Sequence, residues 1–273
     1  MRRGYVETAL GLVHYRRSGH GPPLLLLAAA GRSSRMFAGL MPRLAGFDAI
    51  ALDTPGFGAS DDLARGTSIE DLADAFTQVT DVLGLTEVAL YGLHTGNKIG
   101  AAMAVRHPGR IRRLVLAGQS HSLISDQDTR NAGIRDIIAS YVDMADSARP
   151  DAGKTGKISR LLKLAQDGMH PEIGGDILDH VIDEAEARGT AALYLANFAY
   201  DLGRDFRAIR VPTLVLEIAT PFETARVGLQ GPEVAAMIPD ATLATFAVPD
   251  RDEPLTLEDE ADELARVIGD FCI

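Results

Sequence analysis

Short apolar runs, each bounded by turn-forming residues, alternate along this chain with amphipathic stretches. This alternation is typical of βαβ units, in which parallel strands form a sheet and the intervening helices cover its faces. We therefore predict an α/β fold with a mainly parallel sheet. The predicted strands span residues 13–17, 24–29, 49–52, 88–93, 111–117, 213–218 and 243–248.

One stretch between the strands predicts an amphipathic helix that begins near residue 69. Its apolar residues fall three or four positions apart, and Thr67 or Ser68 can cap it while Glu70 or Asp71 closes a capping box. Residues 120–209 break the strand rhythm and are predicted to form an inserted helical lid. The chain is thereby divided into a core of residues 1–119 and 210–273 and a lid of residues 120–209.

The composition excludes several classes of protein. The chain has 273 residues and a net charge of -11, which disfavours the positive stripe that a nucleic-acid or anionic-membrane surface needs. Cys272 is the only cysteine, so an intramolecular disulfide is excluded, and the first residues lack the apolar core of a signal peptide. We expect a soluble cytoplasmic protein that binds neither nucleic acid nor membranes. The sequence permits a homodimer.

The junction between the strand at 88–93 and the helix after it reads Tyr-Gly-Leu-His-Thr-Gly over residues 91–96. A Gly-x-Ser-x-Gly sequence at such a junction forms a sharp turn that lifts a nucleophile above the end of a sheet. His94 stands here where that motif has its serine. Histidine suits the turn, because it is among the non-glycine residues enriched at positive φ.

In order and spacing, this turn and several other segments resemble the α/β-hydrolase superfamily, and the match covers nearly the whole chain. The resemblance implies the α/β-hydrolase fold, a mainly parallel sheet flanked by helices with an inserted helical lid. The other segments are residues 24–27, 53–61, 106–108, 111–116 and 210–216.

The resemblance also identifies three positions where the family carries a nucleophile, an acid and a histidine base. At the nucleophile position this chain has His94. At the acid position it has Pro221, with Glu223 nearby, and at the base position it has Glu253. No histidine follows His180. The family's Ser-His-Asp triad is therefore predicted to be missing.

His94 is the first candidate catalytic residue, as a general base or a nucleophile. The positive end of the helix dipole disfavours imidazolium at this position and keeps a neutral ring available. A carboxylate would orient the ring; Glu253 is preferred, and Asp250 and Asp252 are alternatives. His121, just past the strand that ends near residue 117, is the second catalytic candidate.

Further residues are predicted to contact a substrate. The backbone N–H groups of Thr95 and Ala30 can form an oxyanion hole, because backbone donors supply it in this fold. Arg32, Ser33 and Ser120 lie in loops after predicted strands and suit a polar or anionic ligand.

These observations lead to two hypotheses of different classes. The first is an enzyme that acts on a small, largely apolar carbonyl or ester compound by a non-serine mechanism, with lyase, cyclase and decarboxylase chemistry as open as hydrolysis. The alternative is a noncatalytic protein that binds a small ligand. No cofactor is predicted, and no metal, because the histidines lack the tight helical spacing of a zinc site.

Overall fold

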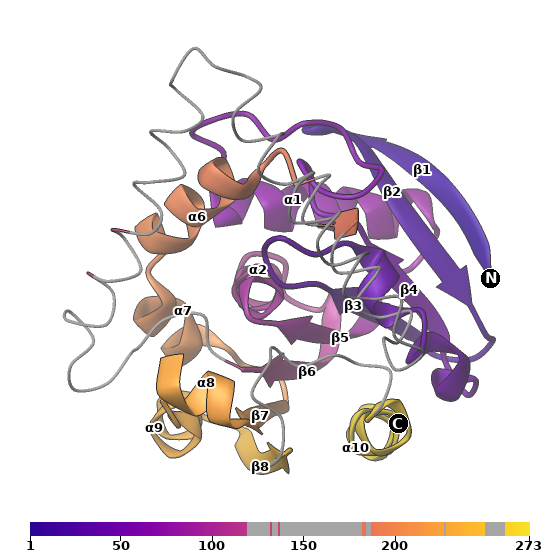
Figure 1. Ribbon diagram of the computed structural model, residues 1–273. Helices are drawn as coiled ribbons and strands as arrows, with labels where there is room; N and C mark the ends of the chain where they lie inside the picture. Colours follow the sequence, from indigo (N-terminus) through magenta and orange to yellow (C-terminus); the bar gives the residue numbers. More distant parts are fainter. Residues whose placement is uncertain (119–131, 133–135, 137–181, 184–186, 227, 249–259) are drawn as a thin grey trace, which may run out of the picture.

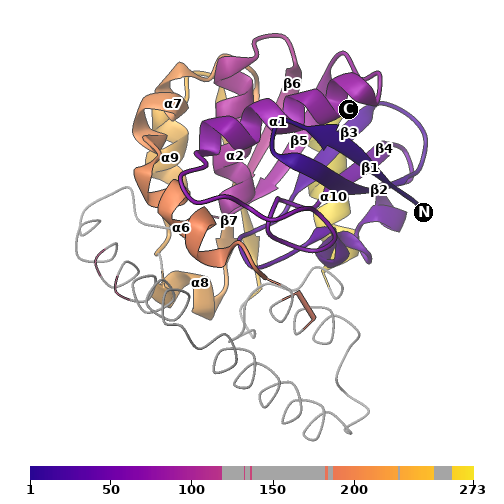
Figure 2. The ribbon, with the colours of Figure 1, turned by 90° about the horizontal axis from the view of Figure 1, so that it is seen from above.

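The computed structural model describes residues 1–118, 187–226, 228–248 and 260–273, together with 132, 136, 182 and 183. Within these residues the chain forms an eight-stranded sheet in the order β1-β2-β4-β3-β5-β6-β7-β8, with helices on both faces (Figures 1 and 2). The β1–β2 and β2–β4 pairs are antiparallel, and all later neighbours are parallel. The predicted α/β-hydrolase fold with a mainly parallel sheet is confirmed.

Every predicted strand is present, with ends shifted by at most two residues. The first strand of the sheet was not predicted, because its side chains are mostly exposed and give no apolar run. The strands are β1 (Arg2–Thr8), β2 (Gly11–Ser18), β3 (Pro23–Leu27), β4 (Asp48–Leu52), β5 (Val88–Leu93), β6 (Ile111–Ala117), β7 (Thr213–Ala219) and β8 (Ala241–Ala247).

The helices form two layers around the sheet. Helices α1, α2, α7 and α9 pack on one face, and η1, η2 and α10 pack on the other (Figures 1 and 2). The predicted capping box of α1 is confirmed at Ser68 and Asp71. The described helices are η1 (Ser34–Phe37), η2 (Met41–Leu44), α1 (Ile69–Val82), α2 (Thr95–Arg106), α6 (Thr190–Ala199), α7 (Leu202–Ala208), α8 (Pro221–Arg226), α9 (Gly231–Met237) and α10 (Ala261–Cys272).

The central strand β3 shows why the interior strands are apolar on both sides. Leu25 and Leu27 belong to the core beneath α1 and α2, while Leu24 and Leu26 belong to the core beneath α10. A parallel strand covered on both faces has no solvent side, so successive residues are all apolar. This burial holds the carboxyl ends of β3 and β5 side by side, with Leu27 paired to Gly92.

Most of the predicted lid lies outside the described residues, and its existence as a separate domain stays a prediction. Its described parts include Asp183, α6 and α7, of which α7 packs on the core through Phe206. None of the helices in the described part of the chain has the length and apolarity required to cross a membrane.

Candidate functional site

The predicted sharp turn connects β5 to α2, and His94 is its apex. His94 has φ 51° and ψ -105°, and it is the only non-glycine residue with positive φ in the described part of the chain. The flanking glycines are required by close backbone approach: a Cβ at Gly92 would collide with the carbonyl of Gly96, and a Cβ at Gly96 with the carbonyl of Leu27. The positive φ predicted for His94 is confirmed.

Hydrogen bonds tie this turn to the end of β6. The N–H of His94 donates to the carbonyl of Ala117 at 2.9 Å, and the His94 carbonyl accepts from the N–H of Asn97 at 3.1 Å. The side chain of Asn97 is fully buried, and its Nδ2 donates to the carbonyl of Gly118 at 2.5 Å. The backbone of the turn at His94 is therefore held both by α2 and by the end of β6.

The His94 ring lies against Gly118 and faces Glu223. A Cβ at Gly118 would stand 2.6 Å from Cδ2 and 2.7 Å from Nε2 of the ring. Nε2 is 3.1 Å from Oε1 of Glu223, close enough for an ion pair, but the two groups lack the alignment of a hydrogen bond. Nε2 is buried, whereas the side chain as a whole is 23% exposed. The exposed part of the ring is therefore the side away from Glu223.

Glu223 reaches this position from α8, immediately after β7. Its N–H is capped by the hydroxyl of Thr220 at 3.0 Å, and its side chain is only 4% exposed. Glu253, the carboxylate preferred from the sequence, lies outside the described residues and stays a prediction, as do Asp250 and Asp252. Among the residues that the structure describes, the carboxylate next to His94 is that of Glu223. Its signal in the sequence was its place two residues after Pro221.

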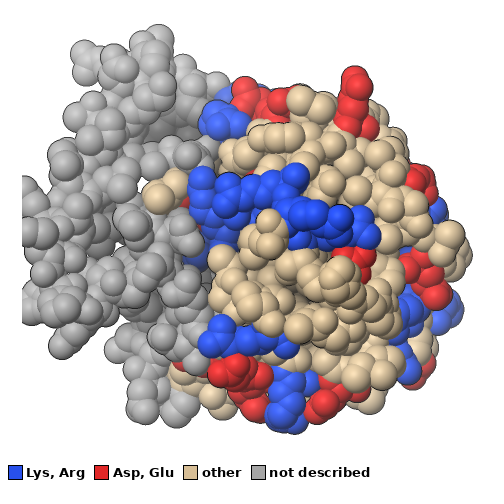
Figure 3. Space-filling model, turned by 90° about the vertical axis from the view of Figure 1, so that its right-hand side faces the viewer, with Lys and Arg blue, Asp and Glu red and all other residues tan. Residues whose placement is uncertain are grey.

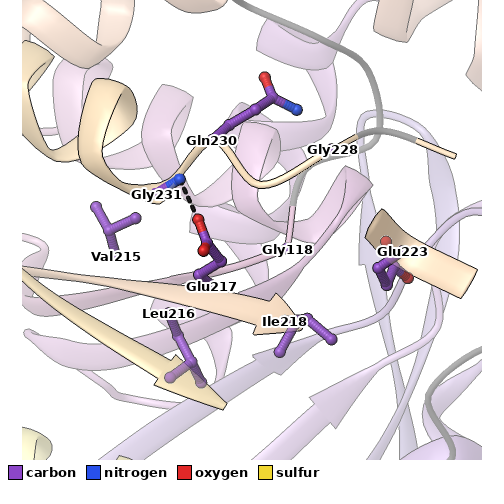
Figure 4. Close-up of a pocket in the computed structure, with 9 residues that line it drawn as sticks. All are labelled: Gly118, Val215, Leu216, Glu217, Ile218, Glu223, Gly228, Gln230 and Gly231. Atoms are coloured by element: carbon purple, nitrogen blue, oxygen red, sulfur yellow. Dashed lines mark hydrogen bonds between the residues drawn. The ribbon is translucent and has the colours of Figure 1, made fainter. Parts of the chain in front are cut away.

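A small cavity adjoins Glu223. Its volume is about 20 Å³, which is enough for one water molecule. Figure 4 shows Glu217 reaching toward the N–H of Gly231, to which it is hydrogen bonded, and Glu223 standing apart from it on α8. Gly118 also lines the cavity. A water molecule has room here next to the carboxylate that faces His94.

The residues predicted to form an oxyanion hole follow the carboxyl ends of two neighbouring strands, β5 and β3. Thr95 follows it directly and is buried, and its hydroxyl accepts a hydrogen bond from Nδ2 of Asn197 at 2.9 Å. Ala30 lies in the loop after β3, the strand next to β5. Within the described part of the chain, neither backbone N–H has an acceptor. Their role in an oxyanion hole stays a prediction.

Arg32 and Ser33, predicted to contact a ligand, hold a carboxylate of the chain itself. Asp183 is 2% exposed and accepts from the N–H of Ser33 at 2.9 Å and from its hydroxyl at 2.5 Å. The Nε of Arg32 and an Nη of Arg35 are each 3.4 Å from the same carboxylate. No sequence pattern indicated Asp183, which is 150 residues from Ser33. His121 and Ser120 lie outside the described residues.

Lys98 is an unexpected ionisable residue one turn beyond His94 on α2. Its side chain is fully buried, and burial lowers the pKa of the ammonium group to about 7. The residues around it on α2 are mostly small or apolar, so the sequence pattern indicated only packing. A substantial share of Lys98 is therefore neutral at neutral pH.

Comparison with known proteins gives one family and several relatives. A family model described as alpha/beta hydrolase fold matches residues 22–219. The AB hydrolase superfamily protein YisY of Bacillus subtilis (strain 168) is 28% identical over 235 residues, 82% of this chain and 84% of that protein. The 2-hydroxymuconate semialdehyde hydrolase of Pseudomonas sp. (strain CF600) is 37% identical over 108 residues, 38% of each chain.

Solved structures share the fold over the whole length. A hydrolase from Pseudomonas aeruginosa PA01 matches with a TM-score of 0.76 at 23% identity, covering 98% of this chain and 97% of that one. The enol-lactonase from Burkholderia xenovorans LB400 matches with a TM-score of 0.69 at 22% identity, covering 98% and 99%.

Proposed function

The chain belongs to the alpha/beta hydrolase fold family, and we propose that it is an enzyme in which His94 stands at the position of the family's serine and acts as a general base. Its relatives in this family include hydrolases. Its substrate is a small organic carbonyl or ester compound. The observation that carries the proposal is the position of His94, at the apex of the turn with Nε2 3.1 Å from Oε1 of Glu223. An imidazole beside a buried carboxylate is the arrangement of a general base with its orienting acid.

In the proposed mechanism the two ring nitrogens of His94 have different tasks. Because Nε2 is buried toward Glu223, Nδ1 is the atom available to a substrate. Nδ1 takes a proton from a water molecule, and the water oxygen forms a bond to the carbonyl carbon of the substrate. The imidazolium then returns the proton to the leaving group as its bond to that carbon breaks. Glu223 stabilises the imidazolium, and the N–H groups of Thr95 and Ala30 stabilise the oxyanion.

His94→Ala distinguishes this enzyme from a noncatalytic ligand-binding protein. Turnover is measured on a panel of p-nitrophenyl esters and vinylogous diketones, and affinity is measured by calorimetry with the compounds that are turned over. Loss of turnover with affinity kept supports the enzyme. Absence of turnover in the wild type as well as in the variant would support the binding protein.

Glu223→Gln tests the carboxylate, and Glu217→Gln is its matched control. Both acids line the same cavity, but only Glu223 faces His94. Turnover should fall about 100-fold in Glu223→Gln, a typical share for acid–base assistance, and change little in Glu217→Gln. Equal losses of turnover in the two variants would show that Glu223 has no specific role in the mechanism.

A serine-directed probe tests the chemistry at position 94. A fluorophosphonate should not label the wild type at this position. His94→Ser should recover little esterase activity, because the proposed base is then the residue that has been removed. Strong esterase activity in His94→Ser would show that the base lies elsewhere.

A further inference from the structure

A second cavity lies at the antiparallel edge of the sheet, lined by residues other than those around His94 and Glu223. Its volume is about 270 Å³, and its walls come from β1, β2, the segment that starts η1 and the segment after β4. This volume is close to the lower end of small-molecule sites, roughly 300 Å³. We propose that this cavity binds a neutral phenol, whose hydroxyl donates a hydrogen bond to Nε2 of His14 and whose ring lies against Tyr5.

A buried carboxylate fixes the imidazole of His14. Oδ2 of Asp53 is 2.8 Å from Nδ1 of His14, and the two side chains are only 3% and 5% exposed. Burial acts to raise the pKa of Asp53, but its hydrogen bonds, that from His14 foremost, outweigh burial and hold the pKa below its ordinary value. The ionised carboxylate can only accept, so Nδ1 of His14 carries a proton. In the neutral ring, Nε2 is then the hydrogen-bond acceptor.

This acceptor nitrogen of His14 is open to a ligand. Within the described part of the chain, Nε2 of His14 has no hydrogen-bond partner. Unlike Nε2 of His94, it is not a buried atom. The residue as a whole is 4% exposed and lines the cavity, so we infer that its open nitrogen faces the cavity. A hydroxyl group that enters there can donate to it.

The strand register sets an aromatic ring beside this nitrogen. Tyr5 of β1 is directly opposite His14 of β2, and the two ring centroids are 5.1 Å apart with the ring planes tilted by 58°. The Tyr5 side chain also lines the cavity, and the residue is 57% exposed. An exposed tyrosine ring offers a stacking surface to another aromatic ring. A phenol can use both groups at once, because its ring and its hydroxyl lie in one plane.

The arginines of the lining are engaged within the chain. Figure 3 shows Lys and Arg side chains in a band across the face that carries β1 and β2. In the cavity, Nε of Arg16 donates to the hydroxyl of Ser34 at 3.0 Å. An Nη of Arg35 is 3.4 Å from Oδ1 of Asp183. Recognition of the ligand therefore depends on the hydrogen bond to His14 and on the aromatic contact, and it needs no charge on the ligand.

The isomers 4-methylphenol and anisole test the proposal, because they contain the same atoms but only 4-methylphenol has a hydroxyl donor. Both are titrated into the full chain at mildly alkaline pH, where imidazole is ordinarily neutral. Calorimetry measures the affinity, and the NMR signal of Nε2 of His14 locates the binding. We expect 4-methylphenol to bind about fivefold more tightly than anisole, as one hydrogen bond allows, and to shift this signal.

Variants of the two residues test each contact. Tyr5→Ala should weaken the binding of 4-methylphenol about fivefold, because the stacking surface is lost. Tyr5→Phe is the matched control, because it keeps the ring, and it should change affinity less than about twofold. His14→Phe should lower the affinity for 4-methylphenol to that for anisole. If loss of the contact with Asp53 unfolds His14→Phe, the two Tyr5 variants still decide, since they change an exposed side chain.

The outcomes separate this site from the proposed active site. A preference for 4-methylphenol, with a shifted His14 signal and a loss in Tyr5→Ala that Tyr5→Phe does not show, supports the proposal. Absence of saturable binding at millimolar concentration would overturn it, as would equal or tighter binding of anisole or an unmoved His14 signal. His94→Ala should leave this binding unchanged, so failure here and failure of the proposed enzyme are distinguishable.

Discussion

Replacing Gly118 by alanine should force His94 away from Glu223. Gly118 has φ 58°, and an alanine Cβ there would lie 2.6 Å from Cδ2 and 2.7 Å from Nε2 of the ring. Normal contact between carbon atoms needs about 3.5 Å or more, so the ring must retreat by roughly 1 Å. Two costs follow: about 1 kcal/mol for alanine in the left-handed region and about 1–3 kcal/mol for the overpacked ring.

Gly84→Ala separates these two costs. Gly84 has φ 70°, close to that of Gly118, but a Cβ there has nothing within 4 Å. Denaturant unfolding should therefore show the backbone cost alone in Gly84→Ala and both costs in Gly118→Ala. The excess should disappear when the ring is removed as well, so a double-mutant cycle with His94→Ala should give a coupling of about 1–3 kcal/mol.

This experiment needs no substrate and examines the placement of the ring directly. If Gly118→Ala and Gly84→Ala cost the same, and the coupling to His94 is within about 0.5 kcal/mol of zero, then the ring does not rest on Gly118. The proposed pairing of His94 with Glu223 would then lose its structural basis.

Three further predictions concern buried charges. The pKa of Lys98 is about 7 in the folded state against an ordinary 10.5, so between these pH values the folded state binds fewer protons than the unfolded state. The free energy of unfolding should therefore rise with pH across this window. Urea unfolding at several pH values should show this rise in the wild type and its absence in Lys98→Met. The lowered pKa of Asp53 stabilises the fold above the ordinary value of 3.8 and is lost as pH falls through the folded pKa, so Asp53→Asn should flatten the acid limb of the same plot. Asp183→Asn should lower the free energy of unfolding by about 1–3 kcal/mol, because the groups around Ser33 lose a charged acceptor. An unchanged free energy of unfolding in urea would show that this contact does not stabilise the fold.

The sequence predicted those parts of the fold that depend on local patterning. Strands β3 and β4 are buried on both faces, so their apolar runs stand out, and α1 carries its own start signal at Ser68. The turn at His94 was predictable because its two glycines are required by contacts within the turn and with the adjacent strand. Strand β1 was missed because its side chains alternate between exposed and partly buried positions without a continuous apolar run.

The site was predicted less completely because its contacts join distant segments. The position of Glu223 relative to His94 depends on how the chain turns from β7 into α8, which no local pattern specifies. Asp183 meets Ser33 across 150 residues of sequence. The sequence indicated single candidate residues such as His94. Which residues lie next to each other could be seen only in the tertiary structure.

The backbone of His94 sets stability against reactivity at one position. Glycine adopts this backbone conformation, with φ 51° and ψ -105°, without steric strain, whereas a residue with a Cβ pays about 1–3 kcal/mol there. If stability alone were selected, glycine would be favoured over histidine at position 94, and the backbone strain of the turn would be lost. Keeping the His94 ring therefore lowers the melting temperature. Laboratory evolution for heat resistance, without a screen for function, should replace His94 early.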